Sequence, residues 1–272
     1  MDIIIYFFVF VFGIIIGSFL NCVIYRLALP GSTSQSNLGK FKSRSFCPKC
    51  RHQLGFFDLI PILSFFVLKG KCRYCREKIS WQYPLVEILT GLIFLLIFNF
   101  QFSIFNEFSI SQFSNLIYLS VISCLLIIIF VYDLKHYLIP DKIIYPAIVI
   151  VFLFNIFNSY IINDKSFFNL LLTAFAAGMF FFLIWLVSRG QWMGFGDVKL
   201  AFFMGLFLGF PIILPALFSA FFIGAIIGLG LIILGKKTLK SRVPFGPFLI
   251  IGTFLALFLG KDLINWYLNL II

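Results

Sequence analysis

Charged residues are scarce in this chain. Asp, Glu, Lys and Arg make up 11% of its 272 residues, whereas hydrophobic residues make up 62%. An average globular domain carries about 25% charged residues, so too few polar side chains remain here to cover a soluble surface. The net charge of +11 does not indicate nucleic acid either, because the charges cluster between apolar runs. The composition excludes a soluble protein and predicts a polytopic membrane protein.

The first apolar segment lacks the features of a cleaved signal peptide. Residues Ile3–Leu20 have no basic region in front of them, and no small-residue cleavage pattern leads from them into polar sequence. We therefore interpret this segment as a retained first helix.

Eight apolar runs predict about eight transmembrane helices and an all-α fold. The runs cover residues 3–24, 85–102, 115–133, 142–162, 167–188, 197–210, 211–235 and 245–268. The sixth run is short for a span of about 20 residues. Its border with the seventh run, at Phe210-Pro211, is the least defined.

The eight predicted spans assign each connecting segment to one side of the membrane or the other, and the basic residues are distributed unevenly between these two sides. Of the 21 Lys and Arg residues, all but Lys165 and Lys261 fall on one side, and many of them lie between Arg26 and Lys78. An excess of Lys and Arg marks the cytoplasmic side of a membrane protein. The long segment between the first two spans is therefore expected in the cytosol, with both termini outside. The basic residues of this segment are also suited to bind anionic lipid headgroups.

Four of the six cysteines follow the spacing C-x2-C-x21-C-x2-C, as Cys47, Cys50, Cys72 and Cys75. Each C-x2-C pair places two sulfurs on one tight turn, and two such turns complete a tetrahedron around Zn²⁺. Four thiolates leave no open position, so the zinc would be structural. A redox dithiol and unligated cysteines are the alternatives, and a cytosolic location disfavours disulfides. Cys22 and Cys124 lie in apolar runs and are expected to act as small hydrophobic residues.

Three aspartates fall at the cytoplasmic boundary of predicted spans: Asp133, Asp141 and Asp197. An ionisable group at this position is costly and is a functional candidate. Two carboxylates can hydrolyse a peptide if one is ionised and draws a proton from water while the other is protonated and hydrogen-bonds the scissile carbonyl. Asp133 and Asp197 suit this task because they come from different spans that packing can bring together. Asp133 and Asp141 suit it less, since eight residues of helix span about 12 Å.

A second group of residues is expected to support the site: Asp141, Gly194, Gly196, Lys199 and Glu87. The two glycines would allow close backbone approach to an extended peptide. Asp141 follows Pro140 and is also suited to cap the next helix. Lys199 is alternatively a charge that snorkels to the membrane surface, and Glu87, at the start of the second span, is alternatively an ordinary interfacial charge.

Several segments together resemble the type IV prepilin peptidase family, the leader peptidases and N-methyltransferases of type IV pilus and type II secretion systems. The first is Gly17-Ser-Phe-Leu-Asn-Cys-Val-Ile-Tyr-Arg-Leu27. The others are the cysteine segment Cys47–Glu87, the run Tyr132–Asp141 and the glycine-aspartate motif Gly194-Phe-Gly-Asp-Val-Lys-Leu200. The resemblance therefore covers almost the whole chain.

The resemblance implies a GxGD-type intramembrane aspartic protease in the bacterial cytoplasmic membrane, with Asp133 and Asp197 as its catalytic pair. It implies cleavage after a glycine, on the cytosolic side, of the basic leader that precedes the hydrophobic helix of a prepilin or pseudopilin. It also implies methylation of the new N-terminus with S-adenosylmethionine, assigned to the N-terminal cytosolic segment. The sequence itself contains no Rossmann fingerprint, and Leu59 stands where the family usually has Asn.

These observations divide the chain into a first transmembrane helix at 1–24, a cytosolic zinc-binding and methyltransferase-type segment at 25–84, and a membrane-embedded peptidase domain at 85–272. Two other interpretations compete: a peptidase without methylase activity, and a membrane transporter or receptor with a zinc-stabilised cytosolic loop. Transporters tend to bury charges near the membrane midplane and to have repeated halves. The candidate aspartates lie at the cytoplasmic edge instead, and no convincing repeat is present, which favours the peptidase.

Overall fold

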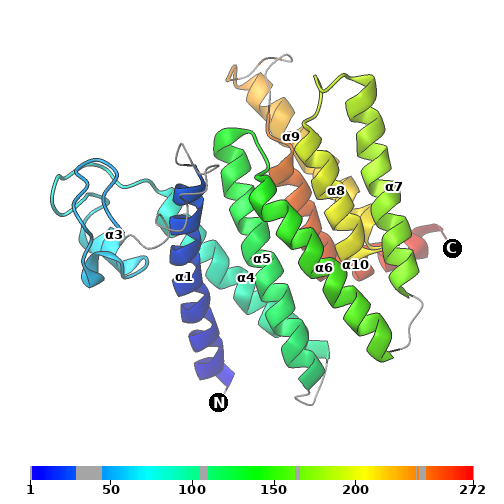
Figure 1. Cartoon of the computed structure of the whole chain (residues 1–272), viewed down its shortest axis with the longest axis horizontal. Coiled ribbons are helices and arrows are strands. Elements are labelled where there is room, and N and C mark those ends of the chain that lie inside the picture. The colour runs from blue at the N-terminus through cyan, green and yellow to red at the C-terminus, as the bar shows by residue number, and fades with distance from the viewer. Residues whose placement is uncertain are drawn as a thin grey trace. The chain divides into compact units, whose positions relative to one another are not determined.

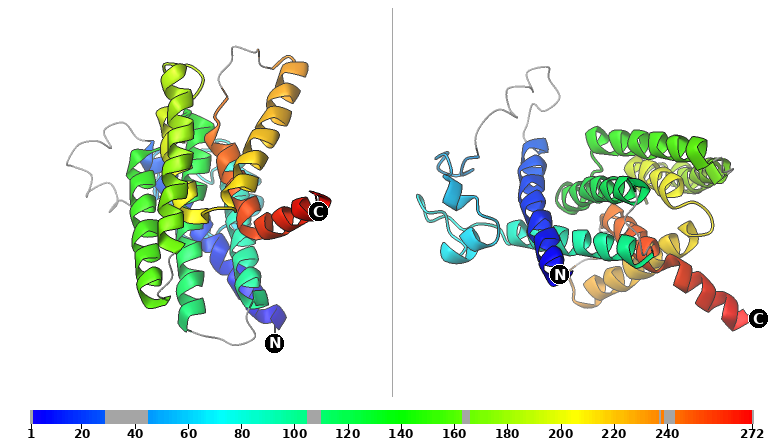
Figure 2. Two further views of the ribbon diagram at one scale, coloured as in Figure 1. Left: turned by 90° about the vertical axis from the view of Figure 1, so that its right-hand side faces the viewer. Right: turned by 90° about the horizontal axis from the view of Figure 1, so that it is seen from below.

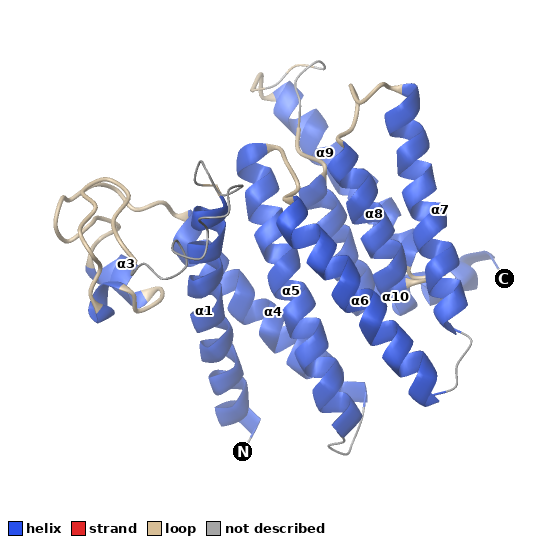
Figure 3. Ribbon diagram, viewed as in Figure 1, coloured by secondary structure: helices blue, strands red, loops and turns tan. Residues whose placement is uncertain are grey.

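The computed structural model of the chain consists of helices and loops in the residues it describes, which are 2–28, 45–104, 110–162, 166–236, 238 and 243–271. The helices are α1 (Asp2–Leu27), η2 (Phe56–Asp58), α3 (Leu63–Val67), α4 (Gln82–Ile104), α5 (Ile110–His136), α6 (Asp141–Ile162), α7 (Ser166–Val187), α8 (Phe195–Leu208), α9 (Ile213–Ile233) and α10 (Gly246–Ile271) (Figure 1). Figure 3 shows no strand among the described residues, where β-pairing is limited to the isolated bridges Phe46–Gln53 and Lys71–Lys78. The predicted all-α fold is confirmed.

Each of the eight predicted apolar runs forms a helix. Within the described residues, seven helices are long and apolar enough to cross a membrane: α1, α4, α5, α6, α7, α9 and α10. The remaining helix, α8, is formed by the sixth run and has 14 residues. It rises about 21 Å, which is less than the roughly 30 Å thickness of a hydrocarbon core. The border near Phe210-Pro211 is a break between helices, since α8 ends at Leu208 and α9 begins at Ile213.

The chain forms two compact units, Met1–Ile128 and Ile129–Ile272, and α5 belongs to both. In the first unit α1 packs against α4, and Figure 2 shows the two helices crossing. The contact depends on small residues, because a Cβ atom on Gly13 or Gly17 would lie 2.8 Å from the Cα atom of Gly91 or Glu87, respectively. Small residues at such crossings allow membrane helices to approach closely. The three-part division predicted from the sequence stays a prediction.

The second unit is built around α8, which packs against α6, α7, α9 and α10. Most side chains between Asp197 and Leu206 are buried, and those of Phe203 and Met204 are fully enclosed. A 14-residue helix that is covered on so many sides is held by packing. The arrangement places the N-terminal end of α8 beside the segments that lead into α6 and α10.

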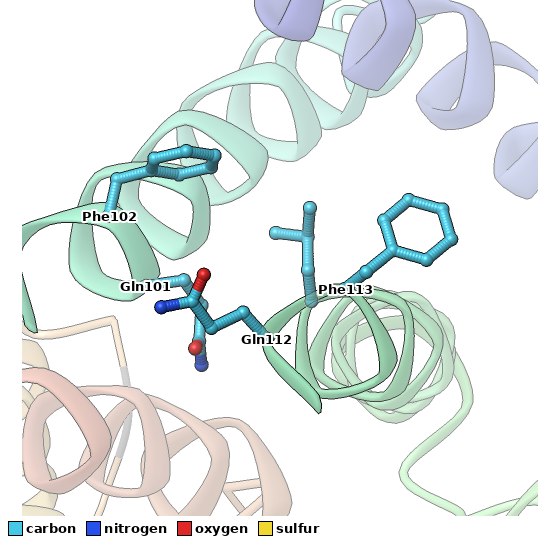
Figure 4. A pocket seen from close by; sticks show the side chains of 5 residues that line it. Gln101, Phe102, Gln112 and Phe113 are labelled. Carbon is cyan, nitrogen blue, oxygen red and sulfur yellow. The ribbon is translucent and has the colours of Figure 1, made fainter. Parts of the chain in front are cut away.

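A small depression lies where α4 ends and α5 begins, lined by Gln101, Phe102, Gln112, Phe113 and Leu116. Figure 4 shows the Gln101 and Gln112 side chains turned toward the same space. Both are buried. The lining contains no carboxylate, thiol or imidazole, so this depression holds none of the groups that the predicted chemistry needs.

Candidate active site and metal centre

Asp133 lies in the last turn of α5, and its side chain is buried. The helix ends at His136, and the backbone of Tyr137 turns to a φ of 56° while its N–H donates to the Asp133 carbonyl oxygen at 2.9 Å. The Asp133 carboxylate accepts a hydrogen bond from the backbone N–H of Gly246, the first residue of α10. A buried carboxylate is thus held at the N-terminal end of a neighbouring helix.

Asp197 is the third residue of α8 and is also buried. Its Oδ2 atom accepts the backbone N–H of Gly194 at 3.2 Å, and its own N–H donates to the Gly194 carbonyl oxygen at 3.1 Å. These reciprocal bonds cap the helix and fix the carboxylate at the N-terminus, where the helix dipole favours a negative charge.

The structure brings Asp133 and Asp197 close enough for their carboxylates to interact electrostatically. The two come from α5 and α8, as the sequence analysis expected of separate helices. Each accepts a backbone N–H at the start of a helix, which stabilises negative charge and partly opposes their mutual repulsion. An arrangement of this kind can hold one proton between two carboxylates.

Two residues that were not among the predicted site residues lie beside predicted ones: Ile139 packs against Gly196, and Gly246 packs against Asp133. A Cβ atom on Gly246 would lie 2.5 Å from Oδ2 of Asp133, and one on Gly196 would lie 2.9 Å from Cβ of Ile139. Both positions therefore require glycine for close packing. In the sequence, Gly246 stands in the segment Pro244-Phe-Gly-Pro247, whose prolines and glycine indicate only a turn.

Asp141 and Lys199 form an ion pair in which Nζ of Lys199 lies 2.5 Å from Oδ1 of Asp141. The lysine side chain is largely covered, and its Nζ lies 4.9 Å from the ring centroid of Tyr145 and 5.3 Å from that of Phe195. The Lys199 ammonium group therefore has a specific ionic partner in Asp141. Together the two residues connect the start of α6 to α8.

Glu87 has its hydrogen-bond partners in the first unit. Its Oε2 atom accepts the backbone N–H of Ile62 at 2.8 Å, and the Ser18 side chain also bonds to it. Ile62 has φ 60° and ψ −55°, and the Leu63 N–H donates to the Pro61 carbonyl at 2.5 Å, which describes a tight γ-turn. This conformation is rare for a β-branched residue. Glu87 therefore fixes a strained turn of the cysteine segment to α4.

The four predicted metal ligands come together, with all sulfurs within 4.8 Å of one another. The Sγ atoms of Cys47 and Cys75 are 3.9 Å apart, close to the edge of about 3.8 Å in a tetrahedron of sulfurs bound to Zn²⁺ at about 2.3 Å. The two turns have the same form. The Arg51 and Arg76 N–H groups donate to the carbonyls of Cys47 and Cys72 at 2.9 Å, and the two arginines have φ of 57° and 58°.

The chemistry of the sulfurs also suits a metal cation. Burial raises the pKa of the Cys47 thiol, but backbone N–H groups of Cys50 and Lys49 outweigh it and lower this pKa to about 7. The backbone at Glu77 acts to lower the pKa of Cys75, whereas desolvation and the other three sulfurs raise it to about 11. One thiolate near neutral pH, with thiols crowded around it, fits a site in which a divalent cation offsets the remaining charge.

A carboxylate outside the sulfur cluster joins η2 to the second cysteine pair. The side chain of Asp58 is almost fully covered and pairs with Nε of Arg73 at 2.8 Å. Its Oδ2 atom accepts the Tyr74 hydroxyl at 3.3 Å and the Gly55 N–H at 3.1 Å. The segment is thus held by its own polar contacts as well as by the four sulfurs.

Two family models match the chain in sequence. The Bacterial Peptidase A24 N-terminal domain matches residues 11–100, and the Type IV leader peptidase family matches residues 118–229. The first match contains the cysteine segment and Glu87, and the second contains Asp133, Asp141 and Asp197. No solved structure matches the chain.

Several relatives match nearly the whole chain, and each carries the name prepilin leader peptidase/N-methyltransferase. The Bacillus subtilis protein is 33% identical over 96% of this chain and 97% of its own length. The Legionella pneumophila protein is 31% identical over 95% and 92%, and the Aeromonas salmonicida protein is 30% identical over 97% and 94%.

Proposed function

Since this chain belongs to the prepilin leader peptidase/N-methyltransferase family, we propose that it removes the leader from type IV prepilins or pseudopilins by activating water between Asp133 and Asp197. The observation that carries this proposal is that two buried carboxylates from different helices lie close enough to interact electrostatically. The transporter or receptor alternative has no support among the three relatives described above, each of which is named as a peptidase.

In the proposed reaction the two carboxylates share one proton. Two close carboxylates do not both ionise readily, so one is ionised and the other protonated. The ionised member takes a proton from water, whose oxygen attacks the scissile carbonyl carbon, while the protonated member donates a hydrogen bond to the carbonyl oxygen. When the peptide bond breaks, the amine leaving group receives a proton from the pair. The proton count of the pair is then restored.

The substrate is proposed to enter as an extended backbone. Gly194 directly precedes α8, and the nearest atom to a Cβ at this position would be Oδ2 of Asp197 at 3.7 Å, so a backbone can approach the dyad there. The corresponding spaces at Gly196 and Gly246 are taken by Ile139 and Asp133. Cleavage follows a glycine at the end of a basic leader, on the cytosolic side that the distribution of Lys and Arg predicts. The positive charge of Lys135 and Lys142 disfavours a leader lying over them, whereas Asp141 offsets the charge of Lys199. The basic residues of the leader would contact lipid headgroups or acidic groups instead.

The second proposed activity is N-methylation of the new N-terminus. The names of the relatives support it, and we assign it to segment 25–84, with S-adenosylmethionine as methyl donor. Cys47, Cys50, Cys72 and Cys75 would hold one Zn²⁺ in this segment. With four thiolate ligands the ion would have no open position, so its role would be to hold the fold together. Residues 29–44 of the segment lie outside the described part of the chain.

The test is co-expression of the chain with a prepilin-like substrate and mass spectrometry of the substrate's N-terminus. A shortened chain that begins at the residue after glycine reports cleavage, and an added methyl group on it reports methylation. Asp133→Asn and Asp197→Asn are the matched variants. An uncleaved substrate with the unmodified enzyme, when the substrate is known to be membrane-inserted, would refute the proposed function.

A further inference from the structure

One surface of the cysteine segment exposes large apolar side chains. We define this apolar face by six residues that are each more than half exposed: Phe56, Phe57, Leu63, Phe66, Val67 and Trp81. Helices η2 and α3 carry all but the last and contact each other. Trp81 joins them through Phe65, whose ring centroid lies 4.9 Å from that of Trp81 and 5.8 Å from that of Phe66. A patch of this kind on so small a segment marks an interaction surface.

The apolar face is tied to a helix of membrane-spanning length. Ile62 lies directly before Leu63, and its N–H is the donor that Glu87 accepts at 2.8 Å. Glu87 lies in the second turn of α4, which is one of the helices long and apolar enough to cross a membrane, and Trp81 directly precedes that helix. Tryptophan is enriched at the level where a span leaves the hydrocarbon. The chain geometry therefore keeps α3 near the membrane surface.

Basic residues border the apolar face. Lys69 and Lys71 follow α3 and are exposed, and Lys78 is paired with Lys71 in an antiparallel bridge. The Lys69 N–H donates to the Phe66 carbonyl at 3.0 Å, which holds this lysine at the end of α3. Within the described residues none of the three lysines takes part in a salt bridge. Exposed aromatic side chains beside unpaired lysines suit an anionic lipid surface.

We propose that the apolar face lies in the headgroup region of an anionic phospholipid bilayer, so that the cysteine segment is a membrane-surface module. In this arrangement the aromatic side chains enter the interface, the lysines contact lipid phosphates, and the Glu87–Ile62 hydrogen bond sets the depth of α3. This placement requires neither cleavage nor methylation.

The test is photocrosslinking of the full-length, zinc-loaded protein in nanodiscs that contain phosphatidylglycerol and phosphatidylcholine. The variant Phe66→p-benzoylphenylalanine probes the apolar face. The control Pro48→p-benzoylphenylalanine probes an exposed residue of the first cysteine pair, outside that face. We expect mass spectrometry to find several-fold more lipid adduct with the Phe66 variant, and less of it when phosphatidylglycerol is omitted. Zinc content shows that both variants are folded.

Three outcomes overturn the placement. The Phe66 variant crosslinks mainly to another part of the chain, it crosslinks mainly to a second copy of the chain, or its yield of lipid adduct is no higher than that of the Pro48 control.

A second pair of variants tests the hydrogen bond between Glu87 and Ile62. Glu87→Ala removes the acceptor and should lower the Phe66 lipid adduct several-fold, whereas Glu87→Gln retains an oxygen that accepts the Ile62 N–H and should restore it. An unchanged yield in Glu87→Ala with normal zinc content shows that this hydrogen bond does not set the depth.

Discussion

Lys199 and Asp141 connect α8 to α6, since Nζ of Lys199 lies 2.5 Å from Oδ1 of Asp141. Lys199 stands two residues after Asp197 on α8, and Asp141 is the first residue of α6. The Asp141 side chain is 58% exposed, so solvent screens the pair and limits its contribution to about 1 kcal/mol or less.

We predict that Asp141→Asn retains measurable cleavage. The amide keeps the shape of the side chain, and a loss of up to about 1 kcal/mol corresponds to roughly a five-fold slower reaction. Initial rates of prepilin cleavage in membranes provide the measurement. If Asp141→Asn is inactive while Asp133→Asn cleaves near the wild-type rate, then Asp141 is the partner of Asp197 and the dyad is misassigned.

Either dyad substitution, Asp133→Asn or Asp197→Asn, should abolish cleavage. Asparagine preserves the shape but cannot ionise, so the pair loses its base and its charge asymmetry together. We expect a loss of at least about 10³-fold, near the upper end of what general acid–base catalysis contributes. The same assay measures it, with zinc content and detergent-solubilised yield as controls for folding. Activity within ten-fold of wild type in either variant contradicts the proposed mechanism.

Gly246→Ala should slow cleavage by roughly 100-fold although it leaves both carboxylates in place. The new Cβ atom would lie 2.5 Å from Oδ2 of Asp133, so the carboxylate or the start of α10 must move. Displacement of a reacting group by about 1 Å can cost on the order of 100-fold in rate. Gly228→Ala in α9 is the matched control, because nothing lies within 4 Å of its Cβ position. Equal cleavage rates for the two variants would show that the contact at Gly246 does not position Asp133.

Replacement of Cys47 and Cys72 by serine should remove one zinc ion per chain and loosen the cysteine segment. Both residues are buried members of the sulfur cluster, and serine does not replace the thiolate ligands. Metal analysis and limited proteolysis provide the measurements, and we expect cleavage to be partly retained because the aspartates lie outside the segment. Zinc-free wild-type protein with an intact, protease-resistant segment is the result that rules out a structural zinc.

Asp58→Asn should weaken the same segment without removing a metal ligand. The substitution leaves Arg73 without its ionic partner and weakens the bonds from Tyr74 and Gly55. Because Arg73 is about half exposed, we expect a loss of about 1–2 kcal/mol in local stability, near the lower part of the range for hydrogen bonds to charged groups. Faster zinc release to a chelator measures it. Release at the wild-type rate contradicts a stabilising role for Asp58.

The predicted orientation can be tested by labelling single cysteines placed at Ser34 and Ser109 in a cysteine-free variant. Both positions lie outside the described residues. The distribution of Lys and Arg predicts that they face opposite sides of the membrane. Impermeant reagents applied to spheroplasts and to inverted vesicles should therefore label them differently. Labelling of both from the same side overturns the predicted topology.

The sequence by itself determined the features that depend on composition and on residues near one another in the chain. Apolar length predicted the helices, because a span of about 20 residues needs little more than hydrophobicity. The cysteine spacing predicted the sulfur cluster, since each C-x2-C turn is local. Asp133 and Asp197 were identified as candidates because charges are rare in such a chain.

Only the tertiary structure decided which distant residues meet. Gly246 reaches Asp133 because α10 begins beside the last turn of α5, and Lys199 finds Asp141 because α8 packs against α6. The role of Glu87 could not be assigned from its position in the sequence. Its hydrogen bond from the Ile62 N–H depends on a γ-turn that no residue propensity predicts. The physical reason is that membrane helices are all apolar, so hydrophobic pattern distinguishes their neighbours weakly. Small residues and a few polar contacts decide how the helices pack.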